Sequence, residues 1–156
     1  MNKIQVQRPR KSTAYDVDYA QWCTEQGEAL REGRFADLDR ENLAEEIESL
    51  GRSDKREIES RLKVLLAHLL KYQFQPEREK DGWKLTIKEQ RRRLQRVIEA
   101  SPSLRAYPDR ILAEEYEYAR GDAAKETGMP IEAFPENCPY RTADVLDLAF
   151  YPQPVH

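Results

Sequence analysis

The chain has 156 residues, of which 35% are charged and 39% hydrophobic, and its 26 Lys and Arg nearly balance its 29 Asp and Glu. The net charge of -3 argues against a disordered chain and against a strongly basic nucleic-acid-binding protein. The length suits one domain with a sizeable core. Ala, Glu, Lys, Leu and Arg make up almost half of the residues, which is typical of long helices.

The N-terminal segment, residues 1–14, is basic and shows no hydrophobic period, so we expect a flexible arm. It lacks the apolar stretch of a secretory signal. The longest apolar run, residues 62–70, is interrupted by Lys63 and His68, which argues against a membrane span. We therefore expect a cytoplasmic protein without a membrane partner.

The first half of the chain predicts two helical stretches. Asp16 or Asp18 can cap a first helix that ends at Gly33. Asp39 opens a second, and its apolar residues recur every three or four positions. Gly51 leaves open whether this stretch is one helix or two. The residues that share its apolar face are Leu43, Ile47, Leu50, Ile58, Leu62, Leu65, Leu69 and Tyr72.

The second half predicts two further long helices and a proline-rich end. A third helix spans residues 81–100, and a fourth carries apolar residues from Ile111 to Ala123 before Gly128 and Pro130. Beyond them only a short helix fits, near residues 142–149. The expected fold is an all-α bundle of four main helices with an irregular C-terminal segment. A single helical domain would cover residues 15–152, followed by a tail of residues 153–156.

Four separate blocks of sequence resemble one known family. They are ENLAEEIESLGRSDKREIESRLKVLLAHLLKYQFQP from Glu41, WKLTIKEQRRRL from Trp83, SPSLR from Ser101 and ETGMPIEAFPENCPY from Glu126. In this order they resemble a bacterial family catalogued as domain of unknown function 29, over residues 15–152. The resemblance implies a helical fold and no established activity.

Metal and thiol chemistry find little support in the sequence. The one internal histidine, His68, lacks the glutamate three positions before it that a di-iron bundle needs. Magnesium at Glu41, Glu45 and Glu48 is formally open, although these residues lie opposite the apolar face, where a solvated surface is expected. Cys23 and Cys138 are far apart and match no metal spacing. No metal and no cofactor are expected.

A stripe of polar residues beside the apolar face of the second helix is the sharper candidate. Asp54, Glu57, Arg61, His68 and Tyr72 project within one sector, and we call them the seam. The spacing of Arg61 and His68 is similar to the Arg-x(4 to 6)-His motif of the HEPN nucleases, in which such a pair cleaves RNA at a dimer interface. The alternative is a histidine hydrogen-bonded across the bundle and an arginine paired with an acid.

A second candidate surface is the basic face of the third helix, formed by Lys84, Lys88, Arg91, Arg92 and Arg96. Acidic residues are equally concentrated on the second and fourth helices. We therefore expect the basic face to form salt bridges within the chain or between subunits rather than to bind nucleic acid. The sequence therefore predicts an interaction or binding module with a protein partner or self-association as a homodimer. The alternative is a HEPN-like ribonuclease that uses Arg61 and His68.

Overall fold

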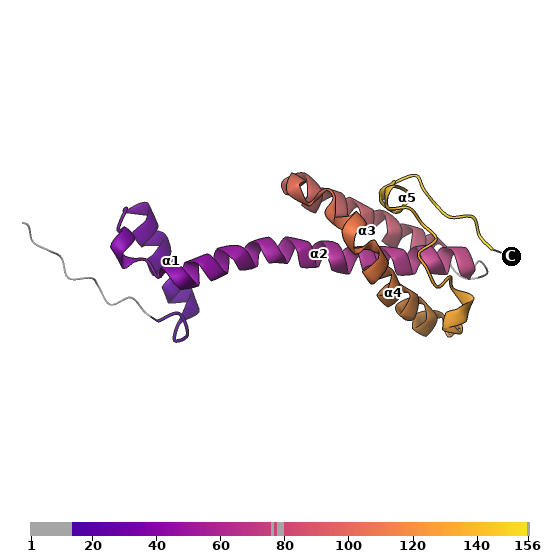
Figure 1. Ribbon diagram of the computed structural model, residues 1–156, viewed down its shortest axis with the longest axis horizontal. Helices are drawn as coiled ribbons and strands as arrows, with labels where there is room; N and C mark the ends of the chain where they lie inside the picture. The colour runs from indigo at the N-terminus through magenta and orange to yellow at the C-terminus, as the bar shows by residue number, and fades with distance from the viewer. Residues whose placement is uncertain (1–13, 76, 78–79, 156) are drawn as a thin grey trace, which may run out of the picture. The chain divides into compact units, whose positions relative to one another are not determined.

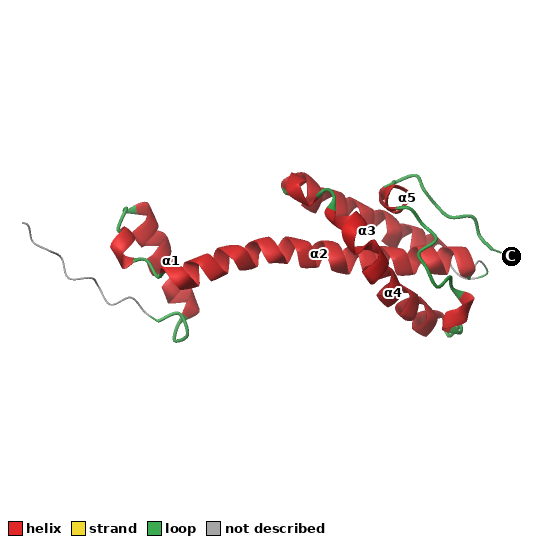
Figure 2. Ribbon diagram, in the orientation of Figure 1, coloured by secondary structure: helices red, strands yellow, loops and turns green. Residues whose placement is uncertain are grey.

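The computed structural model describes residues 14–75, 77 and 80–155, and every regular element among them is helical (Figure 2). This confirms the all-α class. The elements are α1 (Tyr19–Arg31), the 3-10 helix η1 (Phe35–Asp37), α2 (Arg40–Phe74), α3 (Lys80–Ala100), η2 (Pro102–Leu104), α4 (Tyr107–Thr127), η3 (Ile131–Ala133) and α5 (Thr142–Leu146) (Figure 1). The helix α2 is continuous through Gly51.

The chain divides into two compact units. The single domain over residues 15–152 stays a prediction. We call Met1–Gly51 the N-terminal unit and Arg52–His156 the C-terminal unit. The expected basic arm, residues 1–14, lies outside the described residues except for Ala14. Its flexibility stays a prediction.

The N-terminal unit is held by one indole ring and a capping carboxylate. Asp18 caps α1, since its side chain accepts from the backbone N–H of Gln21 at 3.0 Å. The indole N–H of Trp22 donates to the carboxylate of Asp39 at 3.1 Å, and the backbone N–H of Asp39 donates to the buried Gln26 side chain at 2.7 Å. These bonds join α1 to the start of α2, within a unit that has a small core.

The apolar face at the start of α2 is not covered within this unit. Leu43 is half-buried, but Ile47 and Leu50 are 66% and 71% exposed. The buried residues of the unit, Trp22, Gln26 and Ala29, all lie on α1. The helical spacing was thus read correctly, but it does not show which faces another segment covers.

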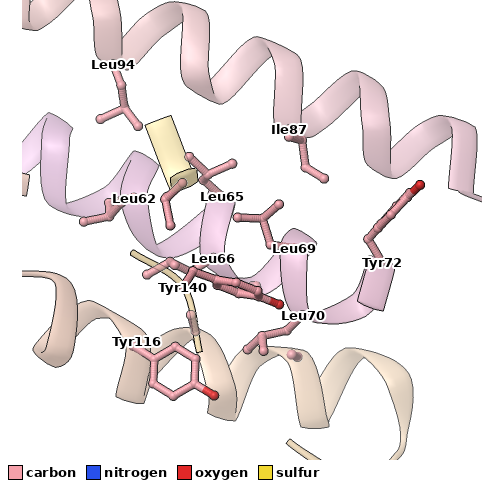
Figure 3. Packing of buried hydrophobic residues seen from close by; sticks show 14 of the residues in the cluster. Leu62, Leu65, Leu66, Leu69, Leu70, Tyr72, Ile87, Leu94, Tyr116 and Tyr140 are labelled. Carbon is pink, nitrogen blue, oxygen red and sulfur yellow. The ribbon is translucent and has the colours of Figure 1, made fainter. Parts of the chain in front are cut away.

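The core of the C-terminal unit is built around the second part of α2, which lies between α3 and α4 (Figure 3). The completely buried leucines of α2 face Ile87 and Leu94 of α3 on one side and Tyr116 of α4 on the other (Figure 3). They are Leu62, Leu65, Leu66, Leu69 and Leu70. On α4, Tyr118 lies within the expected apolar stretch from Ile111 to Ala123 but is exposed, whereas Tyr116 is buried.

The proline-rich C-terminal segment is fastened to the helices by hydrogen bonds. The Tyr116 hydroxyl donates to the Pro135 carbonyl at 2.5 Å, and the Tyr140 hydroxyl donates to the Gln73 side chain at 2.8 Å. The backbone N–H of Val155 donates to the Gln73 carbonyl at 2.8 Å. The described part of the expected tail, residues 153–155, is therefore attached to the end of α2.

Candidate functional site

The N-terminal residues of the predicted seam, Asp54 to Arg61, form hydrogen bonds and an ion pair within the same chain. Asp54 accepts a hydrogen bond from the hydroxyl of Ser101 at 3.0 Å. Arg61 forms an ion pair with Glu57 at 2.8 Å and donates to the side chain of Gln90 on α3 at 3.3 Å. The guanidinium group is thus held by partners on its own helix and on α3.

At the lower end of the seam, Tyr72 is 9% exposed and packs in the C-terminal unit. Its ring centroid lies 5.4 Å from that of Tyr151 in the C-terminal segment. The ammonium group of Lys84 lies over both rings, 5.9 Å and 5.7 Å from their centroids. This end of the seam is an internal packing contact, in which a lysine of α3 covers two tyrosines.

Both ring nitrogens of His68 are engaged. Nδ1 lies 2.8 Å from the carbonyl oxygen of Val64, so this nitrogen carries the proton and donates it. Nε2 is then an acceptor, and Lys71 Nζ lies 3.3 Å from it. Lys71 also donates to Glu126 of α4 at 2.6 Å. The result is a hydrogen-bonded chain from α2 to α4 with a neutral imidazole inside it.

The buried ammonium group of Lys71 is a feature that the sequence interpretation missed. Its side chain is 8% exposed, and its Nζ lies 5.8 Å from the centroid of the Trp83 ring in addition to its bond with Glu126. A lysine is almost never buried without a partner. The position of Lys71 within a run of apolar residues on α2 could have indicated its burial. Its acidic partner could not be identified in this way, because Glu126 lies 55 residues away in sequence.

The pKa of His68 is lowered, chiefly because burial disfavours the charged ring and also because of the positive charge of Lys71, while the Val64 carbonyl and Glu126 act in the opposite direction. In the unfolded chain the ring has its ordinary pKa near 6.5. The contribution of His68 to stability is therefore present above pH 6.5 and is lost as the pH falls through the lowered pKa of the folded state.

We expect the free energy of unfolding to fall more steeply below pH 6.5 in the native protein than in a His68→Gln variant, which has no titrating ring. Urea unfolding followed by circular dichroism at several pH values on each side of 6.5 measures both slopes. Equal slopes would show that the ring titrates alike in the folded and unfolded states.

The cleft at Arg61 does not include His68. A cleft of about 430 Å³ lies beside Arg61 on α2 and α3. It is lined by Ser53, Arg56, Glu57, Ser60, Arg61, Val64 and Gln90, and His68 is not among these residues. The bonded imidazole and the paired guanidinium agree with the structural alternative for these two residues, and the ribonuclease stays a prediction from spacing.

The basic face of α3 has fewer members than expected. Lys88 and Arg96 are exposed, and Arg92 is exposed but paired with Glu89 at 3.1 Å. Arg91 is only 2% exposed and does not belong to this surface. The correction follows from helical geometry, since an advance of about 100° per residue puts position 91 inside the stripe that includes Ile87 and Leu94.

The cysteines and the acidic residues that the structure describes form no metal-binding cluster. Cys138 is half-buried, its thiol lies 3.5 Å from the Tyr140 carbonyl, and burial raises the pKa of the thiol, which disfavours the thiolate. Cys23 is exposed. Among the residues that the structure describes, no three His, Cys, Asp or Glu lie together as a metal site, and this includes Glu41, Glu45 and Glu48.

The two units differ in net charge. Residues 14–51 hold three arginines against eleven Asp and Glu, a net charge of -8, which the four basic residues of positions 1–13 reduce to -4 for the whole N-terminal unit. Residues 52–156 sum to +1. The exposed apolar side chains Ile47 and Leu50 therefore belong to a strongly acidic stretch, residues 14–51. We call Leu43, Ile47 and Leu50 the Ile47 face. The exposure of Ile47 and Leu50 on this face was not foreseen from the sequence.

The comparisons with known proteins give a family and nothing further. A family model described as "Domain of unknown function DUF29" matches residues 14–151. Searches of curated proteins and of solved structures return no match. In the described part of the chain, no helix is both long and apolar enough to cross a membrane.

Proposed function

Because the chain belongs to the DUF29 family, whose function is undefined, we propose a function from its own surface: it is a protein-binding module that docks a partner on the Ile47 face. The observation that carries this proposal is the exposure of Ile47 and Leu50 on one side of a helix, in a stretch, residues 14–51, of net charge -8. Neighbouring exposed apolar residues on one face are a usual mark of interaction sites.

The size of the N-terminal unit supports a binding role. The unit spans Met1–Gly51, and the buried residues among those described are Trp22, Gln26 and Ala29. A unit this small buries a smaller share of its surface than a larger domain and is correspondingly marginal in stability. The unit contains one cysteine, Cys23, and no metal-binding group among its described residues. A bound partner would supply apolar contacts that the unit itself lacks.

The charge of the unit indicates the chemistry of the partner. The net charge of -8 over residues 14–51 attracts a basic polypeptide at long range and disfavours a second copy of the same acidic stretch, because juxtaposed like charges are costly. The partner that fits is a basic amphipathic segment, with Lys or Arg on one side and apolar side chains on the other. The apolar side would cover the Ile47 face.

A synthetic amphipathic helical peptide of Leu and Lys is the probe for this function. We expect the full chain to bind it, with an affinity that falls as salt is added, and to bind the same peptide with Glu in place of Lys much more weakly. Fluorescence anisotropy of the labelled peptides measures both affinities. Equal binding of the two peptides would contradict the proposed partner chemistry.

Replacement of both exposed residues, Ile47→Ser with Leu50→Ser, should weaken binding of the Leu–Lys peptide at least about tenfold. The matched control is Leu85→Ser with Leu148→Ser, two exposed residues of the C-terminal unit, which should leave the affinity unchanged. Circular dichroism checks the fold of both variants. Unchanged binding by the first variant would refute the proposed face.

Sedimentation velocity of the full chain tests whether a second copy of the chain, rather than a basic partner, covers the Ile47 face. We expect no dimer that depends on Ile47 and Leu50, since the acidic units repel each other. A dimer that dissociates in the Ile47→Ser, Leu50→Ser variant would show that a second copy covers the face, and would refute the choice of a basic partner.

A further inference from the structure

Arg91 is a buried cation whose hydrogen bonds are incomplete. Its Nε donates to the Val145 carbonyl at 2.7 Å and its Nη2 to the Asp144 carbonyl at 3.4 Å, and its guanidinium lies 5.6 Å from the centroid of the Tyr151 ring. In the part of the chain that the structure describes, Arg91 Nη1 is the one buried side-chain nitrogen or oxygen without a hydrogen-bond partner. Such a group in a folded protein calls for an explanation.

The positive charge of Arg91 also lacks a direct counterion. Its hydrogen bonds go to carbonyl oxygens, and no ion pair to it is found among the described residues. Burial lowers the pKa of the guanidinium, against the weaker opposing effects of Tyr151 and Asp147. A buried charge without a paired anion is expensive, and a bound anion would remove that cost.

A cavity of about 320 Å³ lies at Arg91, between α3 and the segments that follow it. Ile98 and Leu146 form apolar walls, and Gln95, Glu99 and Arg105 line the remainder. The Gln95 amide donates to Glu99 at 2.8 Å, so the carboxylate in the wall already has a partner. Two arginines and one glutamate leave the cavity with a net charge of one positive unit. An apolar pocket with a few converging polar groups is the usual form of a small-ligand site.

We propose that this cavity binds a small aliphatic monocarboxylate, with the carboxylate on Arg91 Nη1 and Arg105 and the hydrocarbon chain against Ile98 and Leu146. A single negative charge matches the net charge of the lining, and the planar guanidinium suits a carboxylate. Nη1 is covered in the absence of ligand, so binding requires neighbouring side chains of the cavity to move. This site is independent of the Ile47 face.

Hexanoate is the probe, and isothermal titration calorimetry with the full chain is the measurement. We expect saturable binding in the millimolar range or tighter, and binding at least about tenfold weaker for 1-hexanol, which has the same chain but no charge. The Arg91 Nε–H signal in a nitrogen-15 NMR spectrum should shift with hexanoate. Absence of saturable binding, or equal binding of the alcohol, would overturn the proposal. Tighter binding of inorganic phosphate than of hexanoate would overturn the carboxylate assignment.

Arg91→Met tests the buried group, since a methionine fills much of the same space without a charge. We expect this variant to lose hexanoate binding, and Arg92→Met, an exposed neighbour on α3, to keep it. Arg105→Gln, a change at an exposed position, should weaken binding severalfold, and it tests the site even if the Arg91 variant does not fold. Native affinity in Arg105→Gln together with native affinity in a folded Arg91→Met would refute the site.

Discussion

Replacement of Leu69 by alanine should lower the free energy of unfolding of the C-terminal unit by about 3 kcal/mol. Leu69 is completely buried in the cluster that α2 forms with α3 and α4 (Figure 3). The truncation removes the transfer free energy of three carbon atoms and leaves a cavity that the packed helices only partly fill. Urea unfolding followed by circular dichroism at 222 nm measures the loss.

Leu85→Ala is the matched control for Leu69→Ala. Leu85 is also helical, but it is 70% exposed on α3, so its change should stay within about 0.5 kcal/mol. Leucine and alanine both favour helix, and a difference between the variants therefore reports burial rather than propensity. Similar losses in the two variants would contradict the placement of Leu69 in the core.

Trp22→Ala should destabilise the N-terminal unit by about 3–5 kcal/mol and unfold α1 locally. Trp22 is 2% exposed, and its ring contacts Tyr15 at a centroid distance of 4.9 Å and Tyr19 at 6.0 Å. The variant also loses the indole hydrogen bond to Asp39. Because the unit has so small a core, no other buried side chain can compensate.

Hydrogen–deuterium exchange measures the loss at Trp22 locally. The amides of α1 should lose protection in Trp22→Ala, whereas those of α3 and α4 should keep it. Phe35→Ala is the control, since Phe35 is an aromatic residue of the same unit that is 68% exposed. Protection of α1 that survives Trp22→Ala would show that the indole does not hold the unit together.

Local signals predicted the helices well. Asp18 caps α1 as expected, Gly33 follows that helix with φ of 71°, and Gly128 ends α4 with φ of 70°. A cap depends on residues three positions apart, and a left-handed terminal residue depends on the lack of a side chain. Such features are encoded by neighbouring residues, and for this reason the sequence reveals them.

The candidate site was harder to predict, because its partners come from distant segments. Helical spacing grouped the seam residues on one side of α2, but spacing alone could not distinguish a reactive His68 from one bonded to Val64 and Lys71. Arg91 was assigned to a basic surface by its charge, although its angular position placed it with Ile87 and Leu94. For Arg91, the helical period predicted burial correctly, whereas the charge of the side chain did not.

The sequence by itself determined the helical class, the ends of the helices, the family resemblance and the uneven distribution of charge, because each depends on composition or on residues close along the chain. The tertiary structure decided which faces are covered. It left Ile47 and Leu50 exposed, buried Arg91 beneath the C-terminal segment, and joined Lys71 to Glu126. The physical reason is that helical periodicity defines a face, whereas burial and pairing depend on segments more than 50 residues away.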